Sequence, residues 1–192
     1  MSNGMVEAVI VPTVGRVMQF RFVGEESGAF WENRALDGKA PDPASKQWIN
    51  FGGDKSWPAP QADWPKMTGR EWPPPPAFDA MPVEAHVEDN EIELVSPVCK
   101  FYGIQVRRHI EMAESKPLLT ITTTYEKVAG EPARVSVWVI TQLGEPERVF
   151  VQPATKSRYP EGYNKQTEKL PKDLKAEHGL ISLTRDTAKG TK

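Results

Sequence analysis

Hydrophobic and polar residues alternate along much of the chain, and this pattern predicts β-strands. Between Arg16 and Val23 apolar side chains occupy every second position and polar side chains the positions between. A period of two is typical of a half-buried strand in an antiparallel sheet. Similar patterns or β-branched runs predict further strands at 5–11, 29–33, 48–51, 83–87, 91–96, 102–111, 118–125, 135–143, 147–152 and 179–183. No segment shows the 3.6-residue period of an amphipathic helix, so we expect an all-β sandwich or barrel built from antiparallel hairpins.

The region between Gly38 and Pro82 has little periodicity and is rich in proline, glycine and tryptophan. Within it, Asn50–Gln61 combines an amide, a carboxylate, an ammonium and an indole with a Gly-Gly pair and two prolines. We interpret this stretch as a loop that glycines turn and prolines stiffen, which suits a small polar ligand such as a sugar. Trp57 is then the stacking platform for a sugar ring. The alternative is an ordinary ordered loop whose tryptophan fills one end of the core.

Arg108 falls among the apolar positions of the strand predicted at 102–111. A guanidinium on an apolar face needs a carboxylate or a ligand. A structural ion pair with Asp54 or Glu32 is favoured over contact with a sugar. Asp54 itself either binds sugar hydroxyls or caps the turn at Gly53.

Composition excludes several functional classes. The 192 residues fit one domain, and a net charge of −2 gives no field that favours nucleic acid. The single Cys99 excludes an intramolecular disulfide and any site made of several cysteines, and we expect a half-buried structural thiol. No signal peptide is visible and no segment approaches the ~20 apolar residues of a membrane span, so we expect cytoplasmic residence.

Metal and cofactor motifs are weak in this sequence. His86 alternates with Glu84 and Glu88, which could align three ligands, but a solvated strand face is the favoured interpretation. Gly52-Gly53 alone is too little for a phosphate-binding loop. We therefore expect no metal and no cofactor.

Three stretches resemble the galactose mutarotase-like superfamily, and in particular an uncharacterised bacterial branch known only as a domain of unknown function. The first, Val11–Val17, is similar to the family's opening turn before the strand that ends in Phe-Trp-Glu-Asn. The second is Asn50–Gln61. The third is Leu119–Tyr125 followed by Pro132–Gln142, which is similar to the strand pair at the centre of the sugar-binding face. Together they span roughly residues 9–152.

The resemblance implies a twisted antiparallel β-sandwich with a sugar-binding cleft, in which a His acts as general acid and a Glu as general base. The strand that would present the His, Val137–Gln142, contains none, and the chain ends before a late strand that would present the Glu. We therefore expect a C-terminally incomplete sandwich over residues 1–152, with 153–192 as a loose basic tail of the same domain that adds one short strand.

These inferences predict a carbohydrate-binding protein of mutarotase-like fold, and the resemblance implies a degenerate aldose epimerase. The expected substrate-binding residues are Asn50, Asp54, Lys55, Trp57, Gln61 and Arg108. One alternative is a sugar isomerase or lyase that uses Asp54, His86 or Tyr125 as acid or base. Another is a non-catalytic module that needs a missing segment or a partner and self-associates through an exposed sheet edge.

Overall fold

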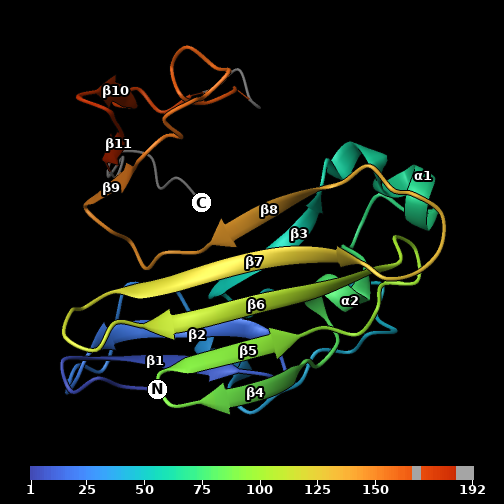
Figure 1. Cartoon of the computed structure of the whole chain (residues 1–192), viewed down its shortest axis with the longest axis horizontal. Coiled ribbons are helices and arrows are strands. Elements are labelled where there is room, and N and C mark those ends of the chain that lie inside the picture. Colours follow the sequence, from blue (N-terminus) through green and yellow to red (C-terminus); the bar gives the residue numbers. More distant parts are fainter. Residues whose placement is uncertain (166–169, 185–192) are drawn as a thin grey trace. The chain divides into compact units, whose positions relative to one another are not determined.

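The computed structural model describes residues 1–165 and 170–184 and confirms a mostly antiparallel β protein (Figure 1). The chain divides into two compact units, Met1–Gly144 and Glu145–Lys192. This division differs from the boundary expected at residue 152. The reason is that strand β9, Arg148–Val151, pairs with β11, Leu180–Thr184, in the C-terminal part of the chain.

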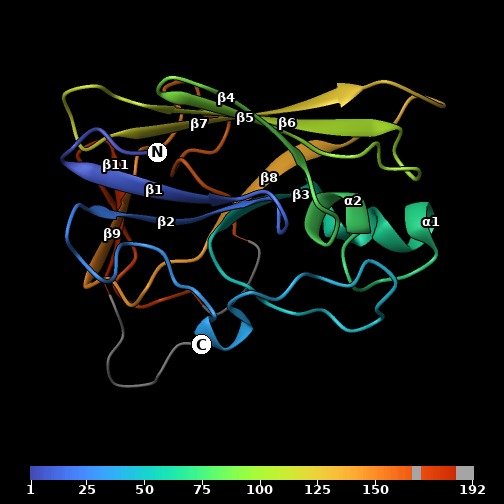
Figure 2. The same ribbon diagram turned by 90° about the horizontal axis from the view of Figure 1, so that it is seen from below.

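The first unit contains two four-stranded antiparallel sheets that lie in two layers (Figure 2). One has the strand order β1-β2-β3-β8, formed by Val6–Val11, Arg16–Phe22, Asp54–Ala59 and Ser136–Thr141. The other has the order β4-β5-β6-β7, formed by Glu84–Glu88, Glu91–Val95, Ile104–Met112 and Leu119–Lys127. Val17 of the first sheet packs with Leu94 and Ile110 of the second, so the core lies between the layers.

Strand β6 shows why the hydrophobic pattern predicts this fold well. Every second side chain from Ile104 to Met112 is buried, and the residues between are half-buried or exposed. Arg108 lies on the buried side, as its position in the pattern predicts.

Strand β3 is the main departure from the sequence analysis, which treats Asp54–Ala59 as part of a loop. These six residues pair with all of β8 but meet β2 only at the pair Val17–Asp54. Beyond Asp54 one edge of β3 has no strand partner, and this is where strands tolerate proline. Pro58 therefore does not prevent a strand whose first five residues are all buried.

The strands predicted at 29–33 and 48–51 do not form. The first is replaced by two isolated bridges, Phe30–Leu143 and Glu32–Gly52. The irregular segment between β2 and β3 instead covers the face of the β1-β2-β3-β8 sheet that points away from the second sheet (Figure 2). Two short helices, α1 Trp64–Thr68 and α2 Pro76–Asp79, follow β3, and two 3-10 turns form at Arg34–Leu36 and Gln61–Asp63. Among the described residues, no helix has the length and apolarity needed to cross a membrane.

The second unit is a small sheet with the order β10-β11-β9. Strand β10, Lys175–Glu177, joins β11 through His178 and Gly179, whose φ angles are 52° and 74°. Positive φ at both positions is what a two-residue hairpin turn of type I′ requires. His178 is therefore a turn residue.

Candidate functional site

Five ionisable side chains are buried around strand β3. They are Arg16, Asp54, Lys55, Asp79 and Arg108, and none is more than 8% exposed. Successive residues of a strand point to opposite faces. Asp54 therefore points toward β6 of the second sheet, whereas Lys55 points toward the irregular segment that covers the outer face.

Asp54 and Arg108 form a buried ion pair that links the two sheets. The Nη2 of Arg108 donates to Oδ1 of Asp54, and Nη1 donates to the Asp54 carbonyl oxygen at 2.9 Å. The other carboxylate oxygen accepts the hydroxyl of Thr141 at 2.5 Å. The ion pair favoured from the sequence is confirmed. Glu32, the other candidate partner, pairs with Arg34 instead.

Asp79 is the second buried carboxylate. Its Oδ1 accepts from Arg16 Nη2 at 2.8 Å and from Trp57 Nε1 at 2.9 Å, and its Oδ2 accepts from Trp48 Nε1 at 2.7 Å. Arg16 also donates to the Gly52 carbonyl oxygen at 2.8 Å. Asp79 thus links Trp48 of the irregular segment to Arg16 of β2 and Trp57 of β3.

Arg16 and Asp79 belong to this cluster but are not among the site residues predicted from the sequence. Asp79 is the only charged residue in the apolar run Ala77–Met81, and an isolated carboxylate in such a run signals a buried partner. That signal was present in the sequence. Its partner could not be inferred, because Arg16 lies 63 residues away.

Lys55 has a less complete set of partners than the other buried ions. Its Nζ donates to Gln142 Oε1 at 3.0 Å and lies 5.3 Å and 5.1 Å from the ring centroids of Trp48 and Trp57. Burial and the nearby charge of Arg16 lower the pKa of Lys55 to about 8, although Asp79 and Asp54 oppose the shift. A buried ammonium with a depressed pKa is common at binding and catalytic sites.

This pKa predicts a pH-dependent stability. Between pH 8 and 10.5 the unfolded chain binds more protons at Lys55 than the folded chain does. The contribution of Lys55 to the free energy of unfolding should therefore rise with pH across this range, by about 3 kcal/mol in total. Replacement of Lys55 by Met should abolish this rise and stabilise the protein at pH 7 by about 1–3 kcal/mol, because no buried charge remains to be desolvated.

Urea unfolding at pH 7.5 and 9.5, followed by tryptophan fluorescence, measures both effects. Every tryptophan lies in the first unit, so the signal reports that unit. Burial raises the pKa of Tyr125 to about 12, and its opposite effect on stability begins only above about pH 10. Exposed Lys100 provides the control variant Lys100→Met. Burial also raises the pKa of Cys99, which lowers stability with rising pH in the wild type and in Lys55→Met alike, so the difference between the two proteins isolates Lys55. An equal pH dependence in the wild type and in Lys55→Met would contradict the assignment.

Five tryptophans form one contact cluster. The Trp57 ring packs edge-on against four others, with centroid distances of 5.5–5.9 Å to Trp48, Trp64, Trp72 and Trp138. Trp57 is only 6% exposed, so its ring is covered by its neighbours. Trp72 and Trp138 are 42% and 37% exposed, and they form the solvent-exposed part of the cluster.

The remaining sequence-predicted residues are spread over different surroundings. The Asn50 side chain accepts from the Gly52 amide at 3.1 Å, which is a local turn contact. Gln61 is exposed and begins a 3-10 turn. His86 lies on β4, opposite Glu93 and on the solvent side of the second sheet, where its nearest ionic partner is Glu84 at 3.8 Å. Of the predicted residues, Asp54, Lys55, Trp57 and Arg108 come together around β3.

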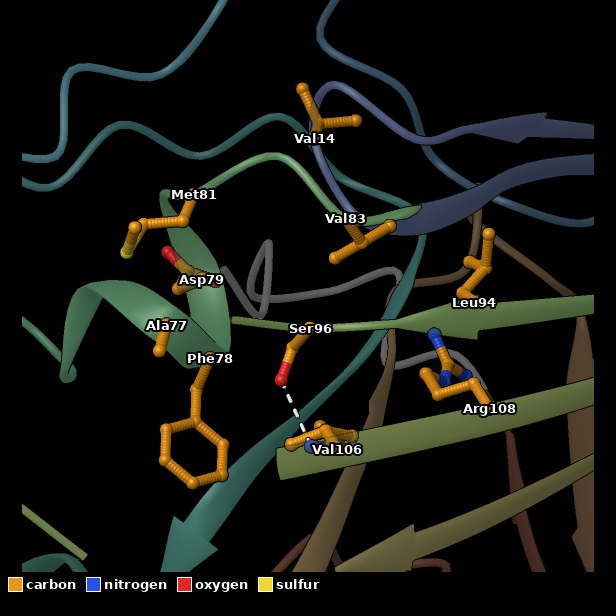
Figure 3. A pocket seen from close by; sticks show the side chains of 12 residues that line it. Val14, Ala77, Phe78, Asp79, Met81, Val83, Leu94, Ser96, Val106 and Arg108 are labelled. Carbon is orange, nitrogen blue, oxygen red and sulfur yellow. Dashed lines mark hydrogen bonds between the residues drawn. The ribbon is translucent and has the colours of Figure 1, made fainter. Parts of the chain in front are cut away.

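Cavities near this cluster are small. One of about 20 Å³ lies beside Arg108, Asp79 and Ser96 (Figure 3), and one of about 30 Å³ lies beneath Trp48. A single water needs about 10–15 Å³ measured in this way, so neither holds a sugar as it stands. A hollow of about 500 Å³ near the N-terminus is large enough, but no aromatic side chain lines it.

One group of metal-ligating side chains occurs in the part of the chain that the structure describes: Glu91, His109 and Glu111. It lies on the solvent side of the second sheet, and His109 Nε2 is 3.5 Å from a Glu91 carboxylate oxygen. Cys99 is a free thiol, fully buried, and burial raises its pKa.

The chain is therefore an antiparallel β protein in which a cluster of buried ionisable side chains surrounds strand β3. The model of a family described as "Domain of unknown function (DUF4380)" matches residues 1–192, so the chain belongs to this family. No curated protein and no solved structure matches the chain.

Proposed function

We propose that this chain is a carbohydrate-binding protein of galactose mutarotase-like fold. The fold proposal is supported by two facing antiparallel sheets and by the order of the stretches that resemble that superfamily. The functional proposal rests on one observation. Two exposed indoles, Trp72 and Trp138, flank Trp57 on a rigid aromatic cluster next to Lys55 and Gln142.

An indole face suits the apolar C–H face of a pyranose, and the neighbouring amide and ammonium suit its hydroxyl groups. The sugar would lie against the exposed rings of Trp72 or Trp138, and Trp57 would support those rings from beneath. Binding on an exposed aromatic surface also agrees with cavities that are too small to enclose a sugar.

The acid–base chemistry of an epimerase has less support. Both carboxylate oxygens of Asp54 accept hydrogen bonds from Arg108 or Thr141, so this carboxylate is committed to the fold. His86 lies on a different sheet and faces solvent. The proposal is therefore binding without a catalytic role for either residue.

Titration with glucose, galactose and mannose, followed by tryptophan fluorescence and calorimetry, tests the proposal. Trp138→Ala and Trp72→Ala should each weaken binding about tenfold, because each removes apolar area from contact with the sugar. Trp31→Ala is the matched control, because Trp31 is equally exposed at 38% and makes no ring contact with the cluster. If no hexose binds in the millimolar range or tighter, the proposed function is wrong.

A second candidate, an interaction module, is supported by strand β8. It is the last strand of its sheet, and it exposes Val137, Trp138 and Val139 without a charged residue. Such an edge favours pairing with another strand. Sedimentation velocity over a hundredfold range of concentration tests this candidate, and a monomer at every concentration would exclude self-association.

A further inference from the structure

The solvent side of the second sheet carries a compact group of metal-ligating side chains. Glu91 lies on β5, and His109 and Glu111 lie on the neighbouring strand β6 (Figure 1). Each side chain offers one ligand atom, and these three atoms all lie within 4.8 Å of one another. Two carboxylates and one imidazole therefore come together above two paired strands.

The pairing of β5 with β6 creates this group. Glu91 is directly opposite Glu111, and His109 is two residues from Glu111 and so lies on the same face of the sheet. Directly opposite residues have Cβ atoms about 4.5–5.5 Å apart, so their long side chains can reach one ion. Two ligands from one strand and one from its neighbour thus form a set that neither strand could form alone.

The separation between His109 and Glu91 fits two ligands of one zinc ion. The Nε2 atom of His109 lies 3.5 Å from a carboxylate oxygen of Glu91, which is longer than an ordinary N–H···O hydrogen bond. Zinc holds nitrogen and oxygen ligands at about 2.0–2.2 Å in tetrahedral geometry, which places two such ligands roughly 3.4 Å apart. The two atoms therefore stand at a distance that suits a shared metal better than direct bonding.

The carboxylates around this group lack a cation. Glu88, Glu91 and Glu111 form one row across β4, β5 and β6, in which each residue is directly opposite the next. Like charges that face each other across a sheet destabilise it. Within the described ranges Glu88 and Glu111 take part in no ion pair, and Glu91 pairs only with His109. A divalent cation bound in this row would neutralise the repulsion.

The three side chains are open to solvent. Those of His109 and Glu91 are 45% and 43% exposed, and Glu111 is exposed as well. An ion can therefore reach all three ligands without any change in the packing of the sheet.

We propose that Glu91, His109 and Glu111 form a binding site for a divalent transition-metal ion such as zinc. Imidazole suits zinc, copper and nickel, whereas magnesium prefers oxygen ligands alone. Three protein ligands leave the fourth tetrahedral position of zinc to a water molecule. This site lies on the second sheet, and the proposed sugar surface involves Trp138 of the first, so neither proposal depends on the other.

Calorimetric titration of the untagged full chain with zinc chloride, and with magnesium chloride for comparison, tests this proposal. One zinc ion should bind per chain, at least about tenfold more tightly than magnesium. His109→Ala and Glu111→Gln should each weaken zinc binding by about tenfold or more, because each removes a ligand. His86→Ala is the matched control, since His86 lies on the same side of this sheet, 3.8 Å from Glu84, but outside the group.

Thermal melting with and without zinc gives a second readout. An ion that binds only the folded chain raises the melting temperature, so zinc should raise it in the wild type and in His86→Ala but not in His109→Ala. A cooperative melt of each variant without zinc shows that it is folded. If zinc up to about 1 mM does not bind the wild type, the group is an ordinary solvated face and the proposal is overturned. Zinc binding that is unchanged in His109→Ala, or that is lost in His86→Ala, would place the ion elsewhere and overturn it equally.

Discussion

Replacement of Arg108 by methionine is expected to lower the free energy of unfolding by about 3–5 kcal/mol. The substitution removes the ionic partner of Asp54 and leaves its carboxylate buried, with the Thr141 hydroxyl as the one remaining side-chain donor among the described residues. It also removes the donor to the Asp54 carbonyl oxygen. The cost therefore comes from an uncompensated buried charge more than from lost packing, since methionine fills much of the same space.

The adjacent residue supplies the control. Arg107 also forms two ion pairs, with Glu93 at 3.3 Å and Glu126 at 2.8 Å, but it lies on the solvent side of β6. Exposed pairs contribute about 1 kcal/mol or less, so Arg107→Met should be nearly neutral. Urea unfolding followed by tryptophan fluorescence measures both variants in the unit that contains them.

The double variant Arg108→Met with Asp54→Asn gives a further check on the cause. Asparagine removes the unpaired charge, so the double variant should be more stable than Arg108→Met alone, although a buried amide remains. Equal losses for Arg107→Met and Arg108→Met would show that the buried pair has no special role.

The position of Arg108 could be predicted from sequence because it depends on a local pattern. The alternation of β6 fixes which face each side chain occupies, and a guanidinium on the buried face requires an acceptor. The choice of Asp54 needed the structure. That choice depends on how β3 faces β6 across the two layers, and no local signal contains this information.

Strand β3 could not be predicted for a related reason. Its Pro58, the following Pro60 and the preceding Gly-Gly pair are typical of a loop, and Asp54–Ala59 has no clear alternation because nearly all of it is buried. Its main partner is β8, about 80 residues later, where Asp54 pairs with Thr141 and Ala59 with Ser136. Tertiary pairing therefore overrides local preference here. For the same reason, Asp54–Ala59 forms the most buried strand of its sheet, although the sequence predicts it as part of a polar loop.

The second unit is another case in which the sequence predicts the strands but not their partners. Both β9 and β11 were expected as strands, but their pairing with each other was not. Local pattern predicts that a strand exists, whereas its partner depends on contacts between distant residues. The division at Gly144 follows from that pairing.

Alanine variants of Trp57 and Trp138 should distinguish a structural role from a binding role. The two residues are directly opposite in the β3–β8 register, and their rings pack edge-on at 5.5 Å. Trp57 is buried, contacts four other indoles and donates to Asp79. Trp57→Ala should therefore lower the free energy of unfolding by about 3–5 kcal/mol.

Trp138→Ala should cost less, about 1–2 kcal/mol in stability, because Trp138 is 37% exposed and the other contacts of Trp57 remain. If Trp138 presents its face to a sugar, the same variant should lose about tenfold in affinity. Urea unfolding and calorimetric titration measure the two variants, with Trp31→Ala as the surface control. A loss of affinity in Trp138→Ala with little loss of stability is a result that a merely structural cluster would not produce. A large loss of stability in Trp138→Ala, or unchanged affinity in that variant, would contradict a platform at Trp138. A Trp57→Ala protein that remains as stable as the wild type would contradict the buried role assigned to Trp57, and with it the rigidity on which the exposed platform depends.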